Sequence, residues 1–79
     1  MSESNLRDIL CRGRSVSFNY CDRRYVVTTI PMGFRYEYAF GEDRGRKVTS
    51  VDLTDLYYRR DYGVSLCEML QLGSNITTY

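Results

Sequence analysis

The side chains best able to contact a ligand in this sequence are arginines and tyrosines. The chain has 79 residues and eleven basic side chains, of which only Lys47 is a lysine, together with eight tyrosines and no tryptophan. Arginine and tyrosine are enriched at the energetic centres of protein interfaces, whereas lysine is depleted there. A compositional bias of the source genome would produce the same enrichment. The residue types therefore point to recognition of a partner, with compositional bias as the open alternative.

Catalysis and metal binding are not expected. The chain has no histidine, which removes the commonest general base. Its three cysteines, Cys11, Cys21 and Cys67, show no CxxC spacing, and a structural zinc needs four ligands. Cys67 falls near the start of a predicted helix, but nothing beside it in the sequence supplies a base, so we interpret it as a small buried thiol. We predict a protein that is not an enzyme and that needs no metal or cofactor.

The charge balance bears on nucleic-acid binding. Formal net charge is +1, whereas generic nucleic-acid binders show a stronger basic excess. The segment from Gly33 to Tyr36 resembles the ribonucleoprotein motif of RNA-recognition domains, but Ala39 stands where that motif needs its last aromatic residue. A single-stranded nucleic-acid or nucleotide binder that uses tyrosine stacking and arginine contacts therefore remains the alternative hypothesis.

Hydrophobic spacing and turn residues predict the elements that would position these side chains. We expect helices over residues 5–12, 50–58 and 66–72, capped by Ser4, Ser50 and Ser65 respectively, with Ser65 and Glu68 forming a capping box. Alternation predicts strands over residues 15–20, 24–30 and 34–40. Residues 41–47 are expected to form a polar loop, and the tail 74–79 is expected to be flexible.

The registers of the strands decide what the aromatic stripe in FRYEYAF does. A two-residue turn at Asp22-Arg23 would pair Tyr20 with Tyr25, and Phe18 with Val27. A second turn at Pro31-Met32 would pair Val27 with Tyr36, and Tyr25 with Tyr38. These registers place one apolar set on a single face of the sheet: Val16, Phe18, Tyr20, Tyr25, Val27, Phe34, Tyr36, Tyr38 and Phe40. We therefore expect the stripe to belong to the core, and Phe18→Ala or Tyr36→Ala to destabilise by about 3–5 kcal/mol. The alternative is a three-residue loop at residues 31–33, which would turn the stripe outward as a binding platform.

The predicted fold is α+β. A single domain spanning residues 1–79 would hold a three-stranded antiparallel β-meander, covered on one face by the N-terminal helix and two short C-terminal helices. The helical apolar residues Leu6, Ile9, Leu10, Leu56, Leu66 and Leu70 would supply that cover. The N-terminal segment has no apolar leader, and no apolar run is long enough to cross a membrane. We expect a cytoplasmic protein in a reducing compartment, with no membrane partner.

The candidate contact residues are the arginines of turns and loops. Turns present side chains without disturbing the core, and binding residues concentrate in them. We predict a protein-binding surface made of Arg23, Arg24, Arg35, Arg44, Arg46, Lys47, Tyr57 and Tyr58. The helical side, with Arg59, Arg60 and Tyr62, is the alternative surface.

The order of motifs resembles small proteins of bacteria and their phages, which have a short helix, an FxYxGxxYxI-type hairpin and a closing GxxLxEIL helix. The resemblance covers most of the chain and is carried by Phe18, Tyr20, Tyr25, Val27, Gly63, Leu66, Glu68 and Leu70. The sequence departs from that pattern at Asp22-Arg23, where the family usually has glycine. The resemblance implies a phage or mobile-element accessory protein. By association with anti-CRISPR proteins, it implies an inhibitor of a host defence protein such as a CRISPR–Cas component.

Overall fold

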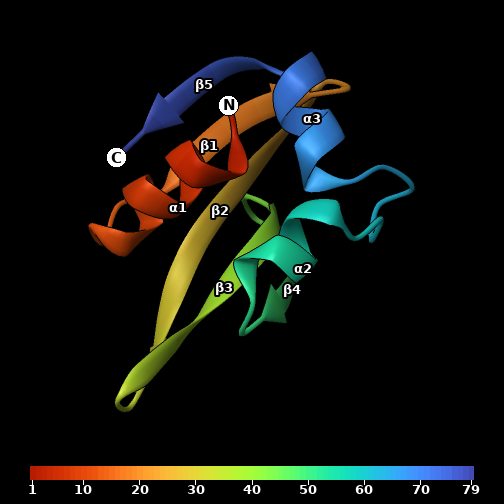
Figure 1. Cartoon of the computed structure of the whole chain (residues 1–79). Helices are drawn as coiled ribbons and strands as arrows, with labels where there is room; N and C mark the ends of the chain where they lie inside the picture. Colours follow the sequence, from red (N-terminus) through yellow and green to blue (C-terminus); the bar gives the residue numbers. More distant parts are fainter.

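A five-stranded antiparallel sheet organises the chain, and three helices lie against one of its faces (Figure 1). The computed structural model describes residues 1–79. Along the chain the elements are α1 (Glu3–Cys11), β1 (Val16–Tyr20), β2 (Arg23–Met32), β3 (Arg35–Glu42), β4 (Lys47–Ser50), α2 (Leu53–Tyr58), α3 (Leu66–Leu72) and β5 (Ser74–Thr78). The spatial order of the strands is β4-β3-β2-β1-β5.

The predicted α+β class is confirmed, but the three-stranded meander is wrong because each edge carries one more strand. At one edge, β4 forms from the end of the expected 41–47 loop and the residues after it, and pairs with β3. At the other edge, the tail that was expected to be flexible forms β5 and pairs with β1. Ser15 and Tyr79 extend this pairing, since each backbone N–H donates to the other residue's carbonyl, at 2.6 and 2.9 Å.

Both predicted hairpin turns occur, but at other residues. The β1–β2 turn is Cys21-Asp22, so Tyr20 pairs with Arg23 and Phe18 with Tyr25. Cys21 and Asp22 both have positive φ, 50° and 62°, as a type I′ turn requires. Because this turn contains no glycine, two residues that carry side chains adopt the left-handed backbone conformation, which is strained.

The β2–β3 turn is Gly33-Phe34 rather than Pro31-Met32. Val27 therefore pairs with Phe40, and Tyr25 with Glu42. Gly33 has a φ of 73°, as the first central residue of a type II′ turn requires. Because this turn lies two residues later than expected, the hairpin is longer than the sequence analysis predicted.

The helices begin at their caps. Helix α1 is capped by the side chain of Ser2 rather than Ser4, and α2 by Asp52 rather than Ser50. Helix α3 has the predicted bounds and the predicted capping box, in which Ser65 and Glu68 each accept a backbone N–H of the other. Since Ser50 belongs to β4, α2 is shorter than expected.

One hydrophobic core lies between the sheet and the three helices. Its fourteen buried residues are Leu6, Leu10, Val16, Phe18, Tyr25, Val27, Tyr38, Phe40, Leu53, Leu56, Tyr57, Leu66, Met69 and Leu70. The helical cover is as predicted, with Ile9 half-buried beside the core. Only half of the aromatic stripe is core, because Tyr38 and Phe40 are buried whereas Phe34 and Tyr36 are exposed. The expectation that Tyr36 is a core residue is wrong.

Candidate functional site

The turn between β1 and β2 and the loop between β3 and β4 lie at the same end of the sheet. Antiparallel pairing brings them together, since the backbone N–H of Asp43 donates to the carbonyl of Arg24 at 2.9 Å. Two adjacent hollows open here, and Arg23 and Arg24 line both of them. The smaller hollow, of about 370 Å³, is lined in addition by Glu42, Asp43 and Arg44.

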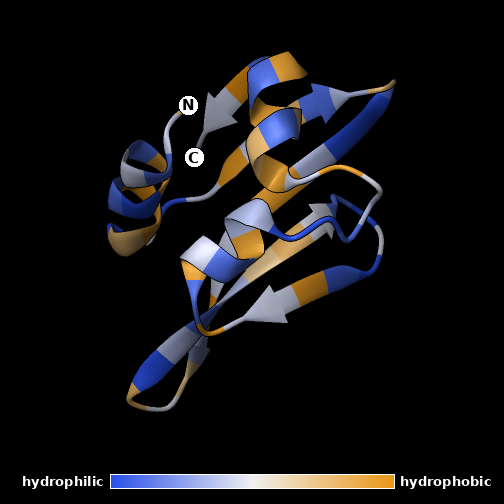
Figure 2. Ribbon diagram, turned by 45° about the vertical axis from the view of Figure 1, so that its right-hand side comes forward, coloured by the Kyte–Doolittle hydropathy of each residue, from blue (hydrophilic) through white to orange (hydrophobic).

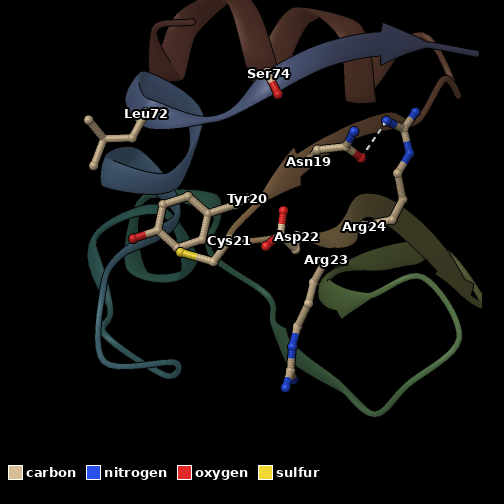
Figure 3. Close-up of a pocket in the computed structure, with 8 residues that line it drawn as sticks. All are labelled: Asn19, Tyr20, Cys21, Asp22, Arg23, Arg24, Leu72 and Ser74. Carbon is tan, nitrogen blue, oxygen red and sulfur yellow. Dashed lines mark hydrogen bonds between the residues drawn. The ribbon is translucent and has the colours of Figure 1, made fainter.

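The larger hollow, of about 560 Å³, is lined by the same two arginines and by residues of β1, the β1–β2 turn and the segment from α3 to β5 (Figure 3). Its remaining lining residues are Asn19, Tyr20, Cys21, Asp22, Leu72 and Ser74. Figure 3 shows the Tyr20 ring and Leu72 at one end, and Arg24, bonded to Asn19, at the other. We name this region, residues 19–24 together with residues 42–47, the arginine end.

Two of the predicted contact residues at the arginine end are already engaged within the protein. The guanidinium of Arg24 donates to Ser17 Oγ at 2.6 Å, to Asn19 Oδ1 at 3.0 Å and to the carbonyl of Asn75 at 3.1 Å. It therefore ties β5 to the hairpin. The Lys47 Nζ donates to the carbonyls of Glu42, Asp43 and Gly45 at 3.1–3.3 Å. It therefore closes the β3–β4 loop.

The other cations of the arginine end are more available. Arg23 forms an ion pair with Glu42 at 2.7 Å, in which the Arg23 side chain is two-thirds exposed. An exposed pair of this kind contributes about 1 kcal/mol or less, so a partner could displace it. Arg44 and Arg46 are exposed and belong to none of the ion pairs in the chain, which involve Arg7, Arg12, Arg23, Arg59 and Arg60.

The eight predicted contact residues do not form one surface. Arg35 pairs with Met32 beside the β2–β3 turn, whereas Arg23 pairs with Tyr20 at the opposite end of β2. Tyr57 is only 3% exposed, and its hydroxyl donates to the carbonyl of Met1 at 2.9 Å, so it is a core residue. Tyr58 is exposed on α2 but lines neither hollow.

Burial of Tyr57 has a consequence for alkaline stability. Burial, followed by the neighbouring Cys67 thiol, raises the pKa of Tyr57 well above its ordinary value of 10. Above pH 10 the unfolded chain loses this proton while the folded chain keeps it, so the free energy of unfolding falls as pH rises. We expect Tyr57→Phe to start less stable at pH 8 because it lacks the hydrogen bond, and then to lose less stability between pH 8 and 11. Urea unfolding at several pH values measures this.

The control is Tyr58→Phe, which alters the neighbouring but exposed ring. It should leave the wild-type decline in place. Equal declines for wild type and Tyr57→Phe would contradict a role for the Tyr57 proton.

Of a second candidate surface, the projecting part of the β2–β3 hairpin, sequence reasoning named only Arg35 as a contact residue. Strand β1 pairs with β2 only as far as Val27, and β4 pairs with β3 only from Tyr38 onward. Residues 29–37 therefore form a two-stranded projection whose tip extends beyond the helices (Figures 1 and 2), while the Tyr36 hydroxyl lies beside the thiol of Cys11, the last residue of α1. We name residues 29–37 the projecting hairpin.

The projecting hairpin carries four of the nine exposed large apolar side chains of the protein. Ile30, Met32 and Tyr36 are 40%, 49% and 43% exposed, and Phe34 is fully exposed at the tip. Arg35, also exposed, lies beside them and belongs to no ion pair. The sequence signal was present in IPMGFRY, since apolar residues surround a turn. Because sequence reasoning placed the turn two residues too early, this exposed apolar group was not recognised.

No family model, curated protein or solved structure matches the chain. No helix reaches the length and apolar character that a membrane crossing needs. No group of three or more cysteine, aspartate or glutamate side chains is placed to hold a metal ion. The case for a function therefore depends on the two surfaces themselves.

Proposed function

We propose that the chain is a non-catalytic protein-binding module that acts by occupying the surface of a partner, with the projecting hairpin as its main contact. The observation that carries this proposal is the exposure of Ile30, Met32, Phe34 and Tyr36 on one projection. Scattered apolar residues are normal on a protein surface, whereas a contiguous apolar group is typical of an interaction site.

The projecting hairpin has the properties of an efficient contact. A two-residue turn fixes the backbone of Phe34, and the Tyr36 side chain is ordered because it packs edge-to-face on Tyr38 with ring centroids 6.0 Å apart. Side chains that are ordered before binding lose less entropy when they bind. Burying one large apolar side chain contributes about 2 kcal/mol, which corresponds to roughly thirtyfold in affinity. Phe34 alone could therefore decide whether a complex forms.

The resemblance of the motif order to small phage and bacterial proteins supports a more specific proposal. On this proposal the chain is a phage or mobile-element accessory protein that blocks a host defence protein, such as a CRISPR–Cas component, in the bacterial cytoplasm. An inhibitor that works by occupying a surface needs a stable scaffold and one good contact. A small domain with a projecting hairpin supplies both.

The arginine end supports the second candidate function, binding of single-stranded nucleic acid or a nucleotide. Arg44 and Arg46 are exposed cations without ion-pair partners, and the Tyr20 ring lines the adjacent hollow. Tyrosine rings can stack bases while arginines contact phosphates. Three carboxylates, those of Asp22, Glu42 and Asp43, line the same two hollows and oppose a polyanion. The projecting hairpin is therefore the stronger candidate.

The test compares capture of partners from a bacterial lysate by immobilised wild type and by Phe34→Ser. We expect Phe34→Ser to retain at least tenfold less of the protein that wild type captures, with an unchanged melting temperature, because Phe34 packs against nothing in the fold. Val51→Ser is the matched control, since it also removes an exposed apolar side chain, but elsewhere.

Two results would contradict the hairpin as the contact. Capture that survives Phe34→Ser and fails in Arg44→Ser/Arg46→Ser would place the contact at the arginine end. Micromolar binding of labelled oligonucleotides that weakens steeply with salt would favour the nucleic-acid function instead.

A further inference from the structure

Resting on the proposed function, we further infer that the partner receives the projecting hairpin into a cleft and contacts both of its faces. The cleft belongs to a folded protein, has apolar walls and carries a carboxylate that meets Arg35 beside the inserted tip. A flat docking surface, a lipid bilayer and a nucleic-acid duplex are the alternatives that the test must distinguish.

The placement of the apolar side chains supports a cleft. In the hairpin Ile30 pairs with Glu37, Pro31 with Tyr36, and Met32 with Arg35. Successive side chains of a strand point to opposite faces, so Ile30 and Met32 lie on the face away from the helices. Tyr36 lies on the opposite face, and Phe34 is at the tip. A flat surface could cover only one of these faces, whereas a cleft covers both faces and the tip.

The backbone of the projecting hairpin is also suited to a cleft. Beyond Val27 on β2 and before Tyr38 on β3, neither strand has an outer neighbour. Both edges therefore present backbone N–H and C=O groups that the walls of a protein cleft can bond, as in strand addition. Residues 29–32 extend roughly 13 Å at about 3.3 Å per residue, which sets the depth the hairpin can reach.

The charges favour a protein over a bilayer or a duplex. Arg35 and Glu37 lie on the same face of the hairpin, and neither belongs to an ion pair. An anionic membrane or a phosphate backbone would attract Arg35 but repel Glu37. Proteins that bind either of them usually do so through a surface with a surplus of basic residues. A protein can place a carboxylate opposite Arg35 and an N–H donor opposite Glu37.

The experiment measures the affinity of variants for the protein that wild type retains, identified by mass spectrometry and then purified. The outer-face variant is Ile30→Thr/Met32→Gln, the inner-face variant is Tyr36→Thr, and the charge variant is Arg35→Glu. Melting temperatures confirm that each variant folds. We expect each face variant to raise Kd at least tenfold, and Arg35→Glu to raise it in a salt-dependent way. A photo-crosslinking side chain at position 30 or 36 should react with the same partner.

The possible failures are distinguishable. If only one face variant weakens binding, or only one position crosslinks, the hairpin lies on a flat surface. The cleft is then wrong while the proposed function stands. If neither face variant nor Phe34→Ser weakens binding, the hairpin is not the contact and both proposals fail. Phe34-dependent binding to vesicles containing anionic lipid, to a duplex oligonucleotide, or to a second copy of the chain in sedimentation would replace the protein cleft with that occupant.

Discussion

Replacing Phe18 by alanine is expected to lower the free energy of unfolding by about 3–5 kcal/mol, the usual cost for a buried phenylalanine. Phe18 is fully buried on β1, one of the inner strands of the sheet. Its ring stacks on Tyr25 and on Phe40, with centroids 5.8 and 6.5 Å apart. A domain of this size is stable by roughly 4–12 kcal/mol, so the substitution removes much of the total and could unfold the protein.

Urea unfolding of wild type and two variants measures this effect. Phe34→Ala is the matched control, because it deletes the same side chain from a fully exposed position and should change stability by about 0.5 kcal/mol or less. A loss at Phe34 comparable to that at Phe18 would mean that the tip of the hairpin packs against the body of the protein, contrary to the structure. A loss of less than about 1 kcal/mol at Phe18 would contradict its place in the core.

The faces of the central strands were predictable although both hairpin turns were misplaced. Moving a two-residue turn by one residue changes every cross-strand partner by two positions, and side chains alternate with a period of two. Phe18 therefore pairs with Tyr25 instead of Val27 and still lies on the same face. The pattern of apolar residues determines the face of a strand, but it does not determine where the turn ends the strand.

The edge strands were not predictable, because their pairing depends on contacts far away in the sequence. The segment SNITT has no alternation of buried and exposed residues, and its first four residues are exposed. It is held by hydrogen bonds to β1 and by the Arg24 guanidinium, which donates to the carbonyl of Asn75. Nothing in the segment itself indicates that it will pair with the edge of β1.

The candidate site was predictable only as a collection of residue types. The sequence shows that Arg24 and Lys47 lie near turns, but not that Ser17, Asn19 and loop carbonyls already satisfy them. Likewise Tyr57 and Tyr58 are adjacent, and helix geometry buries one and exposes the other. The exposed apolar hairpin follows from its length, which exceeds that of its neighbours β1 and β4. Length depends on the turn position that sequence reasoning placed two residues too early.

Substitution of Gly41 has the second large expected effect, because the backbone at the start of β4 occupies the space that a side chain at this position would need. A Cβ at this position would overlap the carbonyl oxygen of Arg46 and would lie 2.9 Å from the Cα of Lys47 and 2.8 Å from the hydroxyl of Tyr62. The first two contacts are backbone atoms that cannot rotate away, so β3 and β4 would have to separate. That separation would disturb the pairing of Gly41 with Lys47 and the hydrogen bond from Tyr62 to Arg46.

We therefore expect Gly41→Ala to lower the free energy of unfolding by about 2–3 kcal/mol, the upper part of the range for overpacking. Gly45→Ala is the control, because its Cβ would meet only atoms of Glu42, the nearest two of which are side-chain atoms at 3.2 and 3.3 Å. It should cost clearly less, since the Glu42 carboxylate oxygen can rotate away and the contact with Glu42 Cβ, at 3.2 Å, needs a shift of only a few tenths of an ångström. Hydrogen exchange adds a local readout, in which Gly41→Ala should weaken protection in β4 more than in β1. Equal stabilities for the two variants would mean that β4 does not pack closely on Gly41, and that the edge of the sheet beside the arginine end is looser than the structure describes.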